Sequence, residues 1–256
     1  MEMLNAHCRV TRDSRDVVTL RICNAGSLNI LSSAVIRDLC AALQELATDR
    51  AIRVLVLAGE SEKSLIGGAD IKEMATLDQT SAEAFITGLA ELCEAVRAFP
   101  PPVIARMPGW CLGGGLEVAA ACDIRIAAHD ARFGMPEVRV GIPSVIHAAL
   151  LPRLIGWGRT RWLLLTAETI DAPTALSWGL VDGVAPEGGL DAAVERTVIS
   201  LLACGPEALR AQKALLRQWE ELPLKESVDL SIGAFGRAFL TDEPKRLMHD
   251  FIARKR

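Results

Sequence analysis

The chain is built around the stretch Pro108-Gly109-Trp110-Cys111-Leu112-Gly113-Gly114-Gly115-Leu116-Glu117. An apolar run at 102–105 precedes it and predicts a strand, and an alanine-rich helical pattern at 116–121 follows it. Three glycines therefore lie where a turn enters a helix, and glycine permits tight turns and the close approach of another molecule. The start of a helix offers unpaired N–H groups. A carboxylate beside such donors suits proton chemistry next to a carbonyl, although glycines that only allow close packing and a solvated glutamate would give the same pattern.

Composition limits the class of protein. The chain has 256 residues, half of them hydrophobic, and a formal net charge of -4. This predicts one large domain, or one domain with an appendage. The only basic run is Arg254-Lys255-Arg256, so we expect no nucleic-acid partner. No apolar run approaches the roughly 18 residues of a membrane helix, and no signal peptide is evident, so we expect no membrane partner.

The seven cysteines are dispersed, with no C-x-x-C spacing, and the four histidines are scattered. This pattern is typical of buried free thiols in a reducing compartment. We therefore expect a cytoplasmic protein without a metal site.

Apolar and turn patterns predict mixed α/β structure followed by helices. Strands are expected at 9–11, 17–22, 53–59, 103–105, 124–127 and 180–184. Helices are expected from Ser32 or Ser33 to 47, from Thr80 or Ser81 to 98, from about 145, and at 172–178, 190–203, 206–219, 225–239 and 243–254. A strand–turn–helix unit recurs at 53–75 and 103–122.

Besides the triple glycine, the sequence contains few motifs that indicate a site. The run is not G-x-G-x-x-G, because position 118 is valine. Ser144 and His147 are spaced to touch on an expected helix, but no nucleophile elbow or acid partner accompanies them. A second glycine-rich turn into a helix spans 65–74, and a second notable carboxylate, Glu137, ends the segment 131–137.

Three ordered segments resemble the enoyl-CoA hydratase/isomerase (crotonase) family: Gly68–Met74, Leu112–Glu117 and Phe133–Glu137. The resemblance extends to 119–123 and 175–181, and covers about residues 10–254. It implies an α/β fold, a crotonase-like spiral of ββα units with the active site in residues 1–195. It further implies a C-terminal helical trimerisation region at 196–256, and a homotrimer or homohexamer. The implied substrate is an acyl-CoA thioester, with coenzyme A as part of the substrate and no separate cofactor.

The resemblance also assigns site residues. In the family two backbone N–H groups bind the thioester oxygen, and by motif these belong to Ala69 and Gly114. Family hydratases use two glutamates to activate water and to deliver a proton, and these match Glu117 and Glu137. For Glu137 a helix-start charge is the plainer alternative. The residues expected to bind substrate are Ser27, Leu28, Gly68, Ala69, Asp70, Ile71, Lys72, Gly113, Gly114 and His147.

The sequence departs from the family in two places. Family hydratases often carry G-x-G-G after the proline that follows the Pro-Glu motif, but here Pro143 precedes Ser144-Val145-Ile146-His147, and the segment before Pro143 looks one residue short. The added bulk predicts a reshaped acyl pocket, for a short or branched acyl group, in which His147 either contacts the acyl end or lies on a helix surface. The second departure, Leu65-Ile66-Gly67 in place of an aromatic and small residues, is expected to affect packing only.

The favoured function is hydration of a trans-2-enoyl-CoA to a 3-hydroxyacyl-CoA by a two-glutamate acid/base mechanism with a backbone oxyanion hole. An enoyl-CoA double-bond isomerase, or another crotonase-type acyl-CoA enzyme, is the alternative, since isomerisation needs only one well-placed base. A non-catalytic CoA-binding scaffold would need no paired carboxylates.

Overall fold

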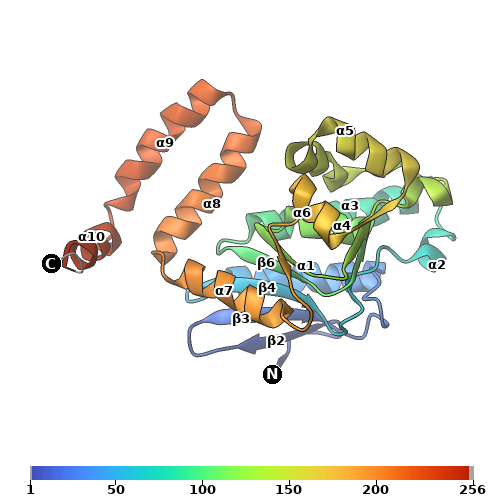
Figure 1. Cartoon of the computed structure of the whole chain (residues 1–256), viewed down its shortest axis with the longest axis horizontal. Helices are drawn as coiled ribbons and strands as arrows, with labels where there is room; N and C mark the ends of the chain where they lie inside the picture. Colours follow the sequence, from blue (N-terminus) through green and yellow to red (C-terminus); the bar gives the residue numbers. More distant parts are fainter. Residues whose placement is uncertain (1, 254–256) are drawn as a thin grey trace.

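Two β-sheets form the centre of the molecule, as the computed structural model shows for residues 2–253 (Figure 1). The larger sheet has the strand order β1-β2-β3-β4-β6-β8-β11. Its strands are β1 (Glu2–Met3), β2 (Cys8–Arg12), β3 (Val17–Ile22), β4 (Val54–Gly59), β6 (Val103–Met107), β8 (Ile124–Ala128) and β11 (Gly183–Ala185). All neighbours from β3 to β11 pair in parallel, and every residue of β4 and β6 is buried, as their continuous apolar runs require.

A smaller sheet has the order β10-β9-β7-β5. Its strands are β5 (Ser64–Ile66), β7 (Trp110–Leu112), β9 (Arg132–Gly134) and β10 (Thr169–Asp171). The sequence patterns did not predict these four strands. Each has three residues, which is too short for an alternating pattern to stand out from a turn.

The small sheet explains the recurring strand–turn–helix unit. Strands β4, β6 and β8 lie in the large sheet, and the strand that follows each of them, β5, β7 and β9, lies in the small one. The units at 53–75 and 103–122 are therefore strand–strand–helix units, which confirms the expected spiral of ββα repeats. Successive units touch closely: the Trp110 N–H donates to the Lys63 carbonyl at 2.9 Å, and a side chain at Gly109 would collide with that same backbone.

The helices of the spiral cover the sheets. They are α1 (Ser33–Ala47), α2 (Ile71–Met74), α3 (Gln79–Ala98), α4 (Gly114–Ala121), α5 (Leu151–Thr166) and α6 (Ala172–Trp178), with two 3-10 helices, η1 (Glu137–Val140) and η2 (Ile146–Leu150). Ser32 caps α1 as predicted, whereas Asp78, not Thr80 or Ser81, caps α3. The helices expected from about 145 are confirmed: the 3-10 helix η2 begins at Ile146, and α5 follows from Leu151.

Helix α4 lies in the interior. All eight of its residues are buried, and small side chains let it approach its neighbours. A Cβ at Gly115 would collide with the Ile66 carbonyl and side chain in β5. The triple glycine therefore permits close packing in addition to any chemical role.

The C-terminal helices are α7 (Leu190–Leu202), α8 (Pro206–Glu221), α9 (Leu224–Ala238) and α10 (Glu243–Ala253). The expected boundary between residues 195 and 196 falls inside α7, because α7 packs on the large sheet through Leu190, Val194 and Val198. The expected last helical residue, 254, and the basic run lie outside the described residues.

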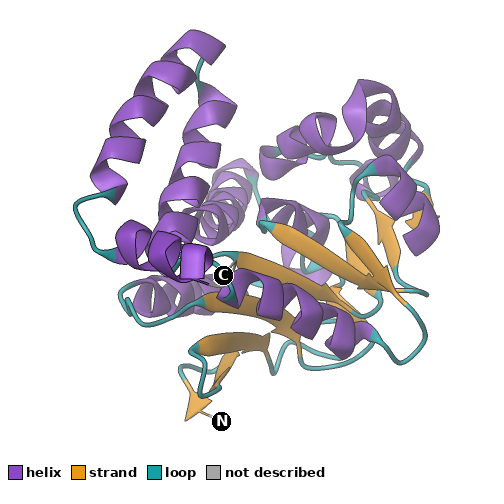
Figure 2. Ribbon diagram, turned by 60° about the vertical axis from the view of Figure 1, so that its left-hand side comes forward, coloured by secondary structure: helices purple, strands orange, loops and turns teal. Residues whose placement is uncertain are grey.

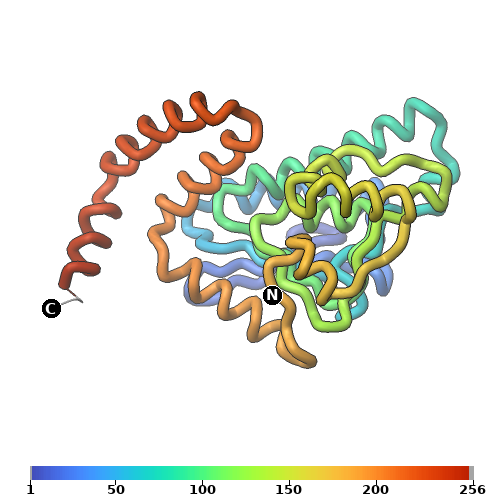
Figure 3. The backbone as a smooth tube through the Cα atoms, turned by 45° about the horizontal axis from the view of Figure 1, so that its top comes forward, coloured from blue at the N-terminus to red at the C-terminus, as the bar shows by residue number. Residues whose placement is uncertain are grey.

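Beyond α7 the chain leaves the sheets. Helices α8 and α9 form a hairpin beside the core (Figure 2), and α10 extends further from it (Figure 3). Lys213 of α8 anchors the hairpin: its buried ammonium donates to Asp123 Oδ2 at 2.6 Å and to the Pro101 carbonyl at 3.1 Å. Within residues 2–253, no helix has the length and apolar character needed to cross a membrane.

Candidate active site

A cavity of about 590 Å³ opens between α3, the turn before α2, the first turn of α4 and the segment from η1 to η2. Its wall is mostly apolar. Two glutamates, Glu117 and Glu137, line it together with the glycine-rich turns. The ββα repeat contributes to this convergence, because β5 of one unit packs beside α4 of the next.

The turn before α2 leaves one amide unused. Leu31 and Ala69 form an isolated parallel bridge, in which the Leu31 N–H donates to the Gly68 carbonyl and the Asp70 N–H donates to the Leu31 carbonyl, both at 2.9 Å. This pattern skips the Ala69 N–H, which finds no acceptor among residues 2–253. Gly68 permits the turn with a φ of +123°. Because Ala69 lines the cavity, its N–H is available to a bound group.

The turn before α4 offers the second amide. Gly113 begins the helix with φ +52° and ψ -127° and supplies no side-chain cap. Gly114 is the first helical residue, so its N–H has no acceptor within its own helix. A Cβ at Gly113 would meet Glu137 Oε1, so the bare glycine leaves room for this carboxylate where it now lies.

Glu117 is a buried carboxylate with one hydrogen bond. It is 4% exposed, and its Oε1 accepts the Ala148 N–H at 2.8 Å. No ion pair within the described chain neutralises it. Burial raises the pKa of Glu117 to about 8, with the Ala148 N–H acting in the opposite direction and the charge of Glu137 adding to the rise. A carboxyl with a pKa near neutrality can both release and accept a proton under ordinary conditions.

Glu137 is half-buried at the start of η1, so it is indeed a helix-start charge, but its side chain also lines the cavity. Its Oε2 accepts a hydrogen bond from the Ser144 hydroxyl at 2.8 Å. Burial raises the pKa of Glu137, and the bond from Ser144 acts against that rise. The site therefore contains two carboxyls whose surroundings both favour the protonated form.

The structure brings most predicted site residues together. Those that line the cavity are Gly68, Ala69, Ile71, Gly113, Gly114, Glu117 and Glu137. Those outside its wall are Ser27, Leu28, Asp70, Lys72 and His147. The first four of these still surround the turn before α2: the Leu28 carbonyl accepts the Gly67 N–H at 2.7 Å, and the Asp70 side chain caps α2.

His147 is turned away from the cavity. Its Nε2 lies 3.8 Å from Glu94 Oε2 on α3, and burial followed by the charge of Arg97 lowers its pKa. The structure therefore does not support the expected contact of His147 with the acyl end, because η2 directs this side chain toward α3. The Ser144 hydroxyl, just before η2, donates to Glu137 and not to His147. Ser144 and His147 therefore form no Ser–His pair. Val145 is the residue of this segment that reaches the cavity.

Sequence reasoning missed the apolar wall of the cavity. It is made by side chains from α2, α3, the turn between them and the η1–η2 segment: Met74, Leu77, Phe85, Ile86, Leu89, Val140 and Ile142. The helical period of α3 indicates an apolar face but cannot say whether that face meets the core or a cavity. The spacing of Ser144 indicates only a possible contact with His147, as a nucleophile pair. It does not indicate the hydrogen bond from Ser144 to Glu137.

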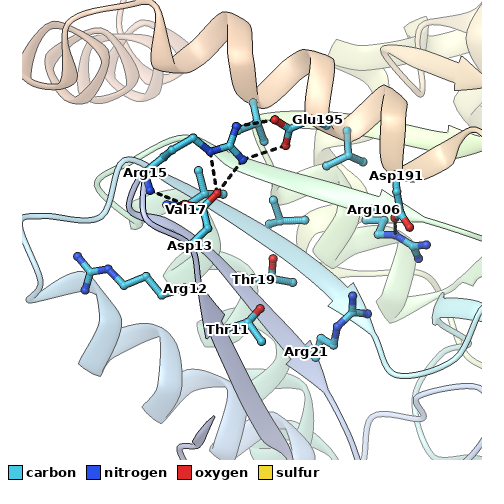
Figure 4. Close-up of a pocket in the computed structure, with 13 residues that line it drawn as sticks. Thr11, Arg12, Asp13, Arg15, Val17, Thr19, Arg21, Arg106, Asp191 and Glu195 are labelled. Atoms are coloured by element: carbon cyan, nitrogen blue, oxygen red, sulfur yellow. Dashed lines mark hydrogen bonds and ion pairs between the residues drawn. The ribbon is translucent and has the colours of Figure 1, made fainter. Parts of the chain in front are cut away.

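A second, smaller pocket of about 240 Å³ lies between β2, β3 and α7 (Figure 4). Most of its charged side chains are already in ion pairs: Arg15 with Asp13 and Glu195, and Arg106 with Asp191 at 2.6 Å. Arg21 instead donates to the Gly59 carbonyl at 3.0 Å. The larger cavity, with two carboxyls and two free amides, is the better candidate.

Comparisons with known proteins agree with this geometry. The family model described as enoyl-CoA hydratase/isomerase matches residues 12–256. A crotonyl-CoA hydratase of Syntrophomonas wolfei is 33% identical over 90% of this chain and 89% of its own length. A short-chain-enoyl-CoA hydratase of Clostridium acetobutylicum is 32% identical over 94% and 92%.

Solved structures give the same result. The enoyl-CoA hydratase of Mycobacterium smegmatis matches with a TM-score of 0.93 at 28% identity, over 98% of this chain and 97% of that one. The enoyl-CoA hydratase of Bacillus anthracis matches with a TM-score of 0.92 at 29% identity, over 97% of each chain.

The fold and the matches define a crotonase-fold enzyme, an enoyl-CoA hydratase-like lyase. The chain belongs to the enoyl-CoA hydratase/isomerase family.

Proposed function

We propose that the protein hydrates a trans-2-enoyl-CoA thioester to a 3-hydroxyacyl-CoA. The observation that carries this proposal is the meeting of two carboxyls, Glu117 and Glu137, and two unused amides, of Ala69 and Gly114, on one mostly apolar cavity. Hydration needs both parts. Water adds to the β-carbon, a proton reaches the α-carbon, and negative charge develops on the thioester oxygen in between.

The two amides would stabilise that oxygen. Fixed N–H donors in a site that excludes water are worth far more than the same donors in water, and losing one costs on the order of 3–4 kcal/mol of barrier in known cases. Ala69 and Gly114 come from two different ββα units, so the spiral itself would set the distance between the donors. No side-chain substitution can delete either N–H, except by proline.

The two glutamates would move the protons. One carboxyl takes a proton from water and the other delivers one to carbon, which requires one group ionised and one protonated. Burial holds the pKa of Glu117 at about 8 and raises that of Glu137. The repulsion between two negative carboxylates favours a state in which one of them is protonated and the other is ionised. An isomerase would need only one of them.

We propose a short acyl chain as substrate. The cavity wall is apolar around Met74, Phe85 and Val145, and two relatives are named for crotonyl and short-chain substrates. The coenzyme A portion of the bound thioester would extend out of the cavity past the turn before α2. There it would lie beside Ser27, Leu28, Asp70 and Lys72, which are outside the cavity wall.

Isosteric variants test the function. Glu117→Gln and Glu137→Gln keep the size and one acceptor oxygen but remove the titrating proton, so each should lower kcat on crotonyl-CoA by about 10²–10⁴-fold. The assay follows the loss of the conjugated double bond, over a panel of trans-2-enoyl-CoA thioesters. Glu73→Gln is the matched control, because this carboxylate also lies in a first helical turn but binds Ser33 instead of lining the cavity.

The outcomes separate the alternatives. Loss in both site variants and near-normal activity in the control is the expected result. Double-bond migration that survives one of the two substitutions would favour an isomerase. No turnover of any thioester by the wild-type protein would reject the hydratase.

We further propose that α8–α10 mediate a homotrimer or homohexamer. Helix α9 exposes apolar side chains along one face, Leu224, Val228, Ile232 and Phe235, with exposed fractions between 52% and 81%. Their spacing of three and four residues gives a stripe suited to a partner surface. Light scattering after size exclusion measures the assembly, and a monomer at micromolar concentration would reject it. The free, mostly buried cysteines support a reducing, cytoplasmic location.

A further inference from the structure

The segment from Ser144 to Ala148 contacts both site glutamates. The Ser144 hydroxyl donates to Glu137 Oε2, and the Ala148 N–H donates to Glu117 Oε1, each at 2.8 Å. The two glutamates come from different ββα units, at the start of η1 and in the first turn of α4. One short segment therefore holds both carboxyls at once.

The two contacts differ in kind. The donor to Glu117 is a backbone amide, which every residue except proline would supply at position 148. The donor to Glu137 is a side chain, so it depends on the identity of residue 144. A residue without a side-chain donor at position 144 would leave this carboxylate oxygen without that bond.

The backbone between the two donors is strained. Ile146 has a φ of +39°, in the left-handed region that β-branched residues avoid. Glycine would adopt this conformation without strain, but this chain has isoleucine there. Strain kept between the two donors is typical of a segment whose geometry serves the site.

The bond from Ser144 fixes where the rest of the carboxyl points. With Oε2 held by Ser144, Oε1 lies against Gly113, the N-cap residue of α4. The charged groups that share this cavity are Glu83 of α3, Glu117 of α4 and Arg139 of η1. Arg139 pairs with Glu168 at 2.9 Å, and no ion pair to Glu137 is found in the described chain, so Ser144 is its side-chain donor.

We propose that Ser144 is a positioning residue that orients the Glu137 carboxyl toward the reacting carbon, opposite a Glu117 carboxyl held by the same segment. This inference rests on the proposed hydratase function. The hydroxyl acts through Glu137 and is not aimed at the substrate itself. Its removal should therefore affect the chemical step more than binding.

The test compares Ser144→Ala and Ser144→Gly, which lose the donor, with Ser144→Thr, which keeps it. The first two should lower kcat on crotonyl-CoA by about tenfold, as expected for a lost hydrogen bond to a carboxylate, with KM changed by less than about threefold. Ser144→Thr should recover most of kcat. Ser200→Ala is the matched control, because that hydroxyl bonds only to the Arg196 carbonyl on the surface of α7.

The pH profile separates positioning from a structural role. A donated hydrogen bond favours the ionised carboxyl, so its loss raises the pKa of Glu137. In Ser144→Ala one limb of the kcat profile should move upward by about half a unit to one unit. Equal profiles and equal kcat in wild type, Ser144→Ala and Ser144→Gly would overturn the proposal, as would a Ser144→Thr variant no better than alanine.

A readout independent of turnover keeps this test distinct from that of the hydratase function. Carbon-13 NMR of labelled glutamate, assigned with Glu137→Gln, follows the titration of Glu137 directly. Its midpoint should rise in Ser144→Ala even if no enoyl-CoA is turned over. An unchanged midpoint would reject the role of Ser144, while a shifted midpoint without activity would reject only the proposed reaction.

Discussion

The turn before α2 and the turn before α4 share one plan. Each follows a strand of the small sheet, contains adjacent glycines, and begins a helix with a glutamate in its first turn, Glu73 or Glu117. Each also presents an amide to the cavity. Their surroundings differ: α2 has four residues, none buried, whereas all eight residues of α4 are buried.

The two glutamates have correspondingly different roles. Glu73 accepts the Ser33 N–H at 3.0 Å and the Ser33 hydroxyl, so both of its oxygens hold α2 against the start of α1. Glu117 accepts a single amide, and its other oxygen has no donor within residues 2–253. A first-turn carboxylate is therefore free to exchange protons with a ligand only where burial removes water and one of its oxygens is left without a donor, as in Glu117. The local sequence alone does not distinguish the two cases.

The largest expected effect is on the pH dependence of the unfolding free energy, which the buried Glu117 carboxyl should dominate. Its pKa is about 8 in the folded protein and about 4.3 in an unfolded chain. The folded state therefore binds the proton more tightly, and the resulting stabilisation is complete below about pH 4 and is lost as pH rises to about 8.

Glu117→Gln removes this dependence. The unfolding free energy of the variant, relative to that of the wild type, should increase by up to about 1.4 kcal/mol for each pH unit between pH 5 and 8. Urea titrations at several pH values measure the difference. Glu137→Gln should show a slope of the same sign, because the pKa of Glu137 is also raised. A difference that does not change with pH would show that Glu117 is not held protonated.

The next effect tests the packing of α4. Gly115→Ala places a Cβ on the Ile66 carbonyl and side chain, so it should destabilise the protein by about 3 kcal/mol. Gly158→Ala in α5 is the matched control, since its Cβ would meet open space. There alanine should stabilise by about 0.5–1 kcal/mol. Similar unfolding free energies for the two variants would mean that α4 can shift away from β5.

The smallest effect tests the exposed turn. The Asp70 carboxylate accepts the N–H groups of Lys72 and Glu73 at 2.9 and 3.3 Å, whereas α4 has no side-chain cap. Asp70→Ala should cost about 1 kcal/mol of unfolding free energy, and Asp70→Asn should cost little, because asparagine keeps an acceptor. An alanine variant as stable as asparagine would show that α2 does not depend on its cap.

The sequence predicted the long elements and the residues of the two turns. Continuous apolar runs identify buried strands such as β4, and the family motifs identify Ala69, Gly114, Glu117 and Glu137, which all line one cavity. The three-residue strands of the small sheet have no pattern of their own and form only because neighbouring units place them side by side. The Ser144–Glu137 contact and the orientation of His147 depend on the strained backbone at Ile146, which no propensity predicts.

The contrast between the two turns has a consequence for how this site can diversify. All side chains of α4 are buried in the protein interior, so nearly any replacement there should lower the free energy of unfolding. The opposite wall, from α2 and the η1–η2 segment, includes exposed residues such as Ile71, Val140, Ile142 and Val145. Because these side chains are exposed, replacing them should cost little folding free energy. In the proposed hydratase this would let the acyl preference change at these positions while Glu117 on α4 and Glu137 at the start of η1 stay in place.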